Sequence, residues 1–128
     1  MNDILREIEP IYESEYINRV KNLPGGDSRF YFDWCTILFH LQRYEKAYEV
    51  GNMTRRRPLP PRGYAKGLML KDKSIIEATL QEVIKDIKDE RLMPYENCLN
   101  VADNWGWYEI GRQLLGLPSI LDQFKEEV

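Results

Sequence analysis

Hydrophobic residues recur with the period of an α-helix along most of the chain. Near the start they stand at i, i+4 and i+7, at Ile4, Ile8 and Ile11. This spacing predicts an amphipathic helix with one apolar face, and Asp3 is a suitable N-cap for it. Pro10 predicts either a kink in this helix or a second helix that starts there. No stretch alternates with a period of two, so we expect no β-sheet.

The longest helical pattern starts at Ser28 and runs to about Val50, with Gly51 as its left-handed stop. Apolar residues occupy two opposite sides of this segment, which is typical of a helix surrounded by others. We therefore expect an all-α fold. It would be a single compact multi-helix domain spanning residues 1–128, arranged around a central helix of about residues 28–50.

Residues 52–71 interrupt the helical pattern because they hold three prolines and a run of arginines. Proline lacks an N–H donor and favours extended backbone, so we expect a basic, Pro-rich connection with only a short helical turn over 65–70. Helical spacing resumes at Asp72 or Ser74 and predicts an amphipathic helix to about Leu92. The last third of the chain predicts helices over residues 94–102 and 105–115, the latter closed by Gly116, and a final helix from Pro118.

The charge is divided unevenly along the 128 residues. The whole chain has 18 Lys and Arg against 21 Asp and Glu, a formal net charge of −3. Residues 54–73 hold seven cations against one anion, so the rest of the chain holds 11 against 20. The sequence thus describes an acidic helical body with a basic segment. This disfavours general nucleic-acid binding and leaves residues 54–73 as the place for any phosphate contact.

The two cysteines and one histidine are too few for a structural zinc site without carboxylates, and we expect no metal or cofactor. Cys35 and Cys98 sit among apolar residues, as reduced buried thiols do. No apolar run approaches the roughly 18 residues of a membrane span, and the acidic start is unlike a signal peptide. We therefore expect a cytoplasmic protein without membrane contact.

A polar stripe on the expected central helix is the first candidate site. Its members follow one another at spacings of 4, 3, 4 and 3: Arg29, Asp33, Thr36, His40 and Arg43. A histidine near a carboxylate and arginines is suited to acid–base work on a phosphodiester. The alternative is a solvent-facing strip with an ordinary i, i+4 ion pair.

Acidic and aromatic residues form a second set of candidates, for binding a partner protein. The carboxylates are Glu7 and Glu13 near the start and Glu82, Asp86 and Asp89 on one flank of a later helix. The aromatics are Trp105, Trp107 and Tyr108, which cannot all face inward because neighbours on a helix are about 100° apart. Exposed carboxylates steer basic partners, and exposed aromatics anchor interfaces.

The basic segment is the third candidate. Its contact residues would be Arg55, Arg56, Arg57 and Arg62. They would bind phosphate, present a proline-rich ligand to a partner, or pair with acidic helices of the same chain.

In size, helical content, acidity and aromatics such as Trp105 and Trp107, the chain resembles the small acidic immunity proteins of bacterial toxin–immunity pairs, including those of contact-dependent growth inhibition. This resemblance implies a non-catalytic protein that binds and neutralises a cognate toxin, often a basic nuclease. Two alternatives stay open. One is a small helical enzyme or RNA-acting protein that uses Asp33, His40, Arg43 and the basic segment, and the other is a regulatory adaptor.

Overall fold

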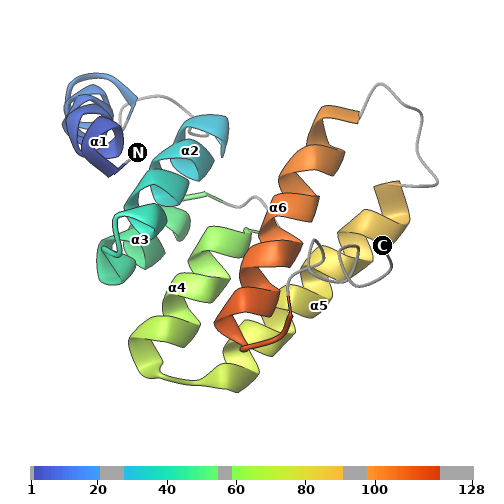
Figure 1. Ribbon diagram of the computed structural model, residues 1–128. Coiled ribbons are helices and arrows are strands. Elements are labelled where there is room, and N and C mark those ends of the chain that lie inside the picture. Colours follow the sequence, from blue (N-terminus) through green and yellow to red (C-terminus); the bar gives the residue numbers. More distant parts are fainter. Residues whose placement is uncertain (1, 21–27, 55–58, 91–97, 119–128) are drawn as a thin grey trace.

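Six helices make up the described part of the chain, which comprises residues 2–20, 28–54, 59–90 and 98–118 of a computed structural model. They are α1 (Asn2–Asn18), α2 (Ser28–His40), α3 (Tyr44–Gly51), α4 (Pro60–Leu70), α5 (Lys73–Glu90) and α6 (Cys98–Leu114) (Figure 1). No strand occurs among these residues, so the all-α prediction is confirmed.

Consecutive helices from α2 to α6 pack against one another, and α4 also contacts α2 and α6. Helix α1 packs on α2 at one side of the molecule, while α5 lies at the other side (Figure 1). The middle of this arrangement is therefore occupied by α2 and α4.

Helix α1 is continuous through Pro10, which excludes two separate helices. The side of α1 that faces the rest of the protein is not the isoleucine side that the sequence predicts. Ile4 and Ile11 are 60% and 61% exposed, whereas Glu9 is only 4% exposed. The apolar face of this helix is therefore largely open to solvent, and a carboxylate is buried in its place.

The expected single helix over 28–50 is wrong, because the chain turns sharply between α2 and α3. The N–H of Gln42 bonds to the carbonyl of Phe39 at 3.0 Å, and the N–H of Arg43 bonds to that of Leu38 at 2.9 Å. This is the Schellman pattern, and Gln42 takes the left-handed conformation that it needs, with φ of 63°. Separate α2 and α3 can then pack side by side, and the Cys35 thiol donates to the Ala47 carbonyl at 3.1 Å.

Gly51 is not a left-handed stop, contrary to the sequence prediction. It is the last residue of α3, and its φ is not positive. A Cβ there would lie 2.8 Å from the Cβ of Arg62, so the glycine permits close approach of α3 and α4.

The expected Pro-rich connection is shorter than residues 52–71, because α4 begins at Pro60. Pro60 and Pro61 occupy the first turn, where the missing N–H groups would have no partner within the helix. Tyr64 is fully buried one turn later and donates to the carbonyl of Trp107 at 2.9 Å, which ties α4 to α6.

The later helices follow the sequence prediction more closely. Asp72 caps α5 by accepting the N–H of Ser74 at 3.0 Å. The predicted break near residue 103 is absent, since α6 is continuous, and Gly116 closes it with φ of 74°. The predicted start at Pro94 and the final helix after Pro118 lie outside the described residues.

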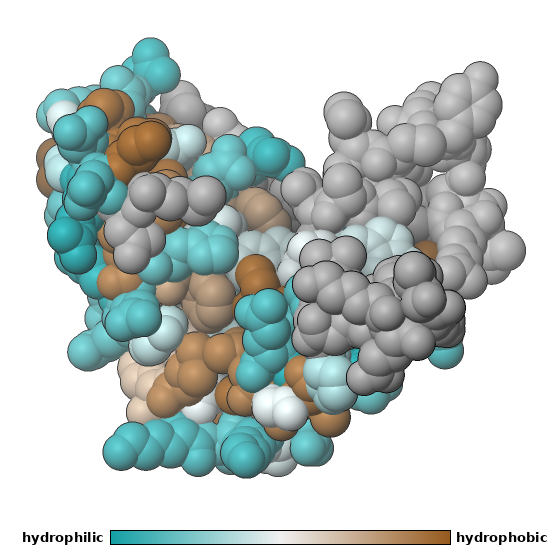
Figure 2. All heavy atoms as spheres, viewed as in Figure 1, coloured by the Kyte–Doolittle hydropathy of each residue, from teal (hydrophilic) through white to brown (hydrophobic). Residues whose placement is uncertain are grey.

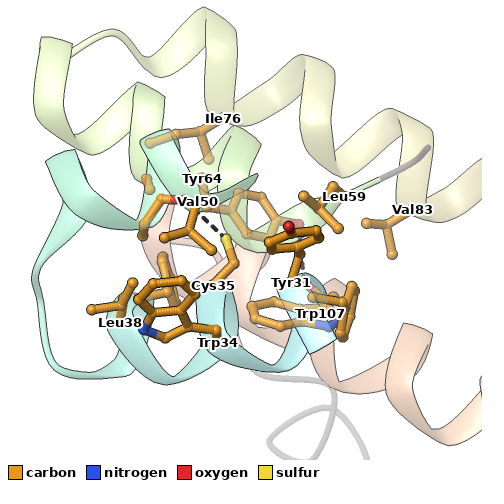
Figure 3. Packing of buried hydrophobic residues seen from close by; sticks show 14 of the residues in the cluster. Tyr31, Trp34, Cys35, Leu38, Val50, Leu59, Tyr64, Ile76, Val83 and Trp107 are labelled. Atoms are coloured by element: carbon orange, nitrogen blue, oxygen red, sulfur yellow. Dashed lines mark hydrogen bonds between the residues drawn. The ribbon is translucent and has the colours of Figure 1, made fainter. Parts of the chain in front are cut away.

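The hydrophobic core collects large side chains from several helices. Trp34, Cys35 and Leu38 of α2 pack with Val50 of α3 and Tyr64 of α4 (Figure 3). Cys35 is fully buried, and burial raises the pKa of its thiol to about 12. This thiol is therefore protonated and unreactive at neutral pH.

Candidate functional site: a groove over helix α2

An open groove of about 470 Å³ runs along the outer face of α2, between α1 and α6. Its lining consists of Tyr12, Arg29, Phe32, Asp33, Thr36, Ile37, His40, Gly106, Trp107 and Ile110. Figure 2 shows the hollow between the α1–α2 side of the molecule and α6, with hydrophobic residues at its floor. Four of the five residues of the predicted polar stripe belong to this lining.

Three of these four polar residues are bonded within α2 itself. The Arg29 guanidinium pairs with the Asp33 carboxylate at 3.2 Å, as the i, i+4 spacing predicts. The Thr36 hydroxyl donates to the carbonyl of Phe32 at 2.8 Å. The groove therefore presents a compensated ion pair above an aromatic floor.

His40 lies at the other end of the groove and stacks on Trp107, with ring centroids 6.0 Å apart and an interplanar angle of 21°. Partial burial lowers the pKa of this imidazole below its ordinary value of 6.5, so it is neutral at pH 7. Asp33 stands two helical turns away, a rise of about 10 Å along the axis. A direct hydrogen bond between the two along the helix is therefore not available.

Arg43 does not belong to the stripe, contrary to the sequence prediction, because α2 ends at His40. Its guanidinium instead pairs with the buried carboxylate of Glu9 at 3.2 Å. Lys46 pairs with the other oxygen of Glu9 at 3.4 Å, and the Trp34 indole N–H donates to that oxygen at 3.0 Å. This cluster fastens α1 to α2 and α3.

Burial alone would raise the pKa of Glu9, but the Trp34 hydrogen bond and the charges of Lys46 and Arg43 outweigh it. The net result is a pKa below the ordinary value of 4.5, so Glu9 stays ionised in the folded protein at neutral pH. The carboxylate is thus satisfied by structural partners and orients the wall of the groove.

Sequence reasoning missed Tyr12 as a groove-lining residue and Glu9 as the buried carboxylate that holds α1 in place. Tyr12 lines the groove and packs on Phe30, with ring centroids 5.1 Å apart. Tyr16 packs on Trp34 at 5.4 Å. Glu9, Tyr12 and Tyr16 stand at i, i+3 and i+7, a spacing that places them on one side of a helix. This spacing could have predicted a second packing face of α1 in addition to the isoleucine face.

The predicted aromatic anchors divide between core and surface. Trp107 is buried, Trp105 is exposed and Tyr108 is half-buried. Trp105 and Tyr108 meet edge to face at 5.5 Å and, with Ile84, Ile87 and Lys88 of α5, line a second pocket of about 180 Å³.

The predicted carboxylates lie on separate surfaces. Glu7 is exposed on α1, and Glu13 binds Lys46 at 3.1 Å. Glu82 and Asp89 are exposed on α5 and Asp86 is half-buried, all three on the flank away from Lys88 and the Trp105 pocket. Because α1 and α5 lie at opposite sides, the two acidic groups do not share one surface (Figure 1).

Part of the basic segment serves the fold. The Arg62 guanidinium donates to the Gly51 carbonyl at 3.2 Å, and the Lys66 ammonium lies 5.7 Å from the centre of the Tyr48 ring. These contacts join α4 to α3. Arg55, Arg56 and Arg57 lie outside the described residues.

A scan against protein-family models finds no match for the chain, and searches of curated proteins and of solved structures find none either. Within the described residues, no three His, Cys, Asp or Glu side chains are grouped closely enough to hold a metal ion. None of the described helices is both long and apolar enough to span a membrane.

Proposed function

We propose that this chain is a non-catalytic binding protein and, specifically, an immunity protein that binds and neutralises a cognate bacterial toxin. The groove over α2 carries the proposal. It joins an aromatic floor, formed by Phe32 and Trp107, to a rim with the Arg29–Asp33 pair. Protein interfaces typically combine such an apolar, aromatic centre with a polar rim.

The chemistry of the groove supports binding better than acid–base catalysis. Asp33 is engaged by Arg29, His40 is stacked on Trp107, and Arg43 belongs to the Glu9 cluster. Three groups held by three different neighbours do not converge on one reacting atom, which general acid–base chemistry requires. Asp33 and His40 are held in the groove by these neighbours, and side chains that are already held lose less conformational entropy when a partner binds.

The distribution of charge supports a basic partner, such as a nuclease. The residues outside 54–73 carry 11 cations against 20 anions. A field of this sign attracts a basic protein and raises the rate of association, more at low than at high ionic strength.

Co-expression with the products of neighbouring genes in the native genome tests the proposal. We expect one neighbour to arrest growth alone and to be neutralised by this chain, with a nanomolar complex measured by calorimetry. An inhibitor acts at one molecule per toxin, whereas an enzyme that inactivated the toxin would act at far lower ratios. The His40→Ala variant should protect as well as the wild type. If no neighbour is toxic, or if protection is substoichiometric and needs His40, the proposal is wrong.

A further inference from the structure

The exposed isoleucines of α1 continue into the groove. Ile4, Ile8 and Tyr12 stand at i, i+4 and i+8, so they form one row along the helix, and Ile11 lies beside this row. The row passes from exposed Ile4 through half-buried Ile8 to Tyr12, which lines the groove. Figure 2 shows hydrophobic residues on the surface over α1. The α1 row and the groove floor therefore form one strip, which we call the α1–α2 strip.

The strip has the shape of a trough. Helices α1 and α6 stand on either side of the outer face of α2 and supply the two walls of the groove. On the α6 wall, a Cβ added to Gly106 would meet no atom within 4 Å, so this wall is open where the glycine stands. Arg29 and His40 lie at the two ends of the trough along α2. The rise of the helix between them is about 16 Å, the length of three helical turns.

The net charge of the α1–α2 strip is negative. Exposed Glu7 stands on the same side of α1 as Ile4 and Ile11, at i+3 and i−4 from them. The Arg29 cation in the groove is compensated by Asp33, and the nearby Arg43 and Lys46 are compensated together by Glu9 and Glu13. A partner that fits this surface combines apolar side chains with positive charge.

We propose that the α1–α2 strip is the docking site for one basic amphipathic helix of a partner protein. Its apolar side would lie on Ile4, Ile11 and the groove floor, and its Lys or Arg side chains would face Glu7. This is the helix-in-groove mode of recognition, in which anchors repeat at i, i+3, i+4 and i+7. The inference deepens the proposed function and rests on it, since it names the contact that the toxin would make.

A model peptide tests the site without knowledge of the partner. The probe is a leucine–lysine amphipathic peptide of about 18 residues, and the charge control is a leucine–glutamate peptide of the same pattern. We expect the lysine peptide to bind the full chain at least about tenfold more tightly than the glutamate peptide, as measured by calorimetry.

Two matched pairs of variants locate the contact. Gly106→Leu places a side chain in the trough, whereas Gly106→Ala changes the backbone in the same way and leaves the trough open. Ile11→Lys alters the strip, whereas Ile17→Lys alters an isoleucine of similar exposure, 54%, on another side of α1. Gly106→Leu and Ile11→Lys should each weaken binding of the lysine peptide by at least about tenfold, and their controls by less than about twofold. Thermal unfolding by circular dichroism confirms that all four variants fold.

Equal binding of both peptides, or binding that Gly106→Leu leaves intact, overturns the inference. It is overturned also if light scattering shows a dimer that Gly106→Leu dissociates, because the occupant would then be a second copy of this chain. If only the proposed function is wrong, the peptides bind as expected, but this chain neutralises no toxin encoded by a neighbouring gene. Conversely, a toxin neutralised equally by wild type and Gly106→Leu refutes only the docking site.

Discussion

Replacement of Glu9 by alanine should destabilise the protein more than replacement of any exposed carboxylate on α1. The substitution removes the acceptor of the Trp34 indole N–H and the anion that Arg43 and Lys46 share. Breaking a buried ion pair costs about 3–5 kcal/mol when its partner stays buried. Here the side chains of Arg43 and Lys46 are 46% and 25% exposed and can be rehydrated, so the low end applies.

The expected loss is therefore about 3 kcal/mol, most of it from the lost charged hydrogen bonds and the unsatisfied indole N–H. For a chain of this length, that corresponds to a fall in Tm of about 12 °C. Urea denaturation followed by circular dichroism measures the free energy, and tryptophan fluorescence reports the environment of Trp34. Unfolding should begin with release of α1, because Glu9 is its buried polar link to α2 and α3.

Glu13→Ala is the matched control. Its carboxylate pairs with the same Lys46 at 3.1 Å, but its side chain is 45% exposed, against 5% for the side chain of Glu9. Such surface pairs contribute about 0.2–1 kcal/mol. If Glu9→Ala costs no more than Glu13→Ala, the buried cluster does not hold α1 and the reasoning fails.

Four further changes have definite expected signs. Gln42→Gly should stabilise the protein by about 0.5–1 kcal/mol, because glycine adopts the left-handed turn after α2 without strain; equal or lower stability in urea would contradict this. Gly106→Ala should raise Tm, since the site is open and mid-helix glycine costs about 0.5–1 kcal/mol. Gly63→Ala, by contrast, should lower Tm, because its methyl group would collide with the Thr79 side chain. If Gly106→Ala and Gly63→Ala shifted Tm in the same direction, the packing described around these two glycines would be wrong. Finally, Glu9 contributes stability above its unfolded pKa, near 4.5, because its folded pKa is lower. This contribution should disappear as pH falls through the folded pKa, so acid titration of Glu9→Gln should show a shallower loss of stability than the wild type.

A partner helix in the α1–α2 strip would also depend on the Glu9 cluster. The cluster positions α1 beside α2, and Tyr12 of α1 is part of the groove lining. Loss of Glu9 should thus weaken partner binding through the position of α1, without contact between Glu9 and the partner.

Local signals correctly predicted several features that depend on neighbouring residues. The apolar period alone predicts an all-α chain, the Asp72 cap and the Gly116 stop follow from single residue types, and the i, i+4 spacing predicts the Arg29–Asp33 pair. Each of these interactions closes within one or two helical turns, so residue type and spacing contain the necessary information.

Tertiary packing decided the rest. Gln42 has no strong local preference for the left-handed conformation, and the turn there lets α3 return along α2. The orientation of α1 is decided in the same way, because Glu9 can be buried only where Trp34, Arg43 and Lys46 supply its partners. Those partners lie 25 or more residues away in the chain, so no periodicity within α1 can reveal that its isoleucines remain at the surface. The sequence by itself determines that these segments are helices, and the fold determines which of their faces are left for a partner.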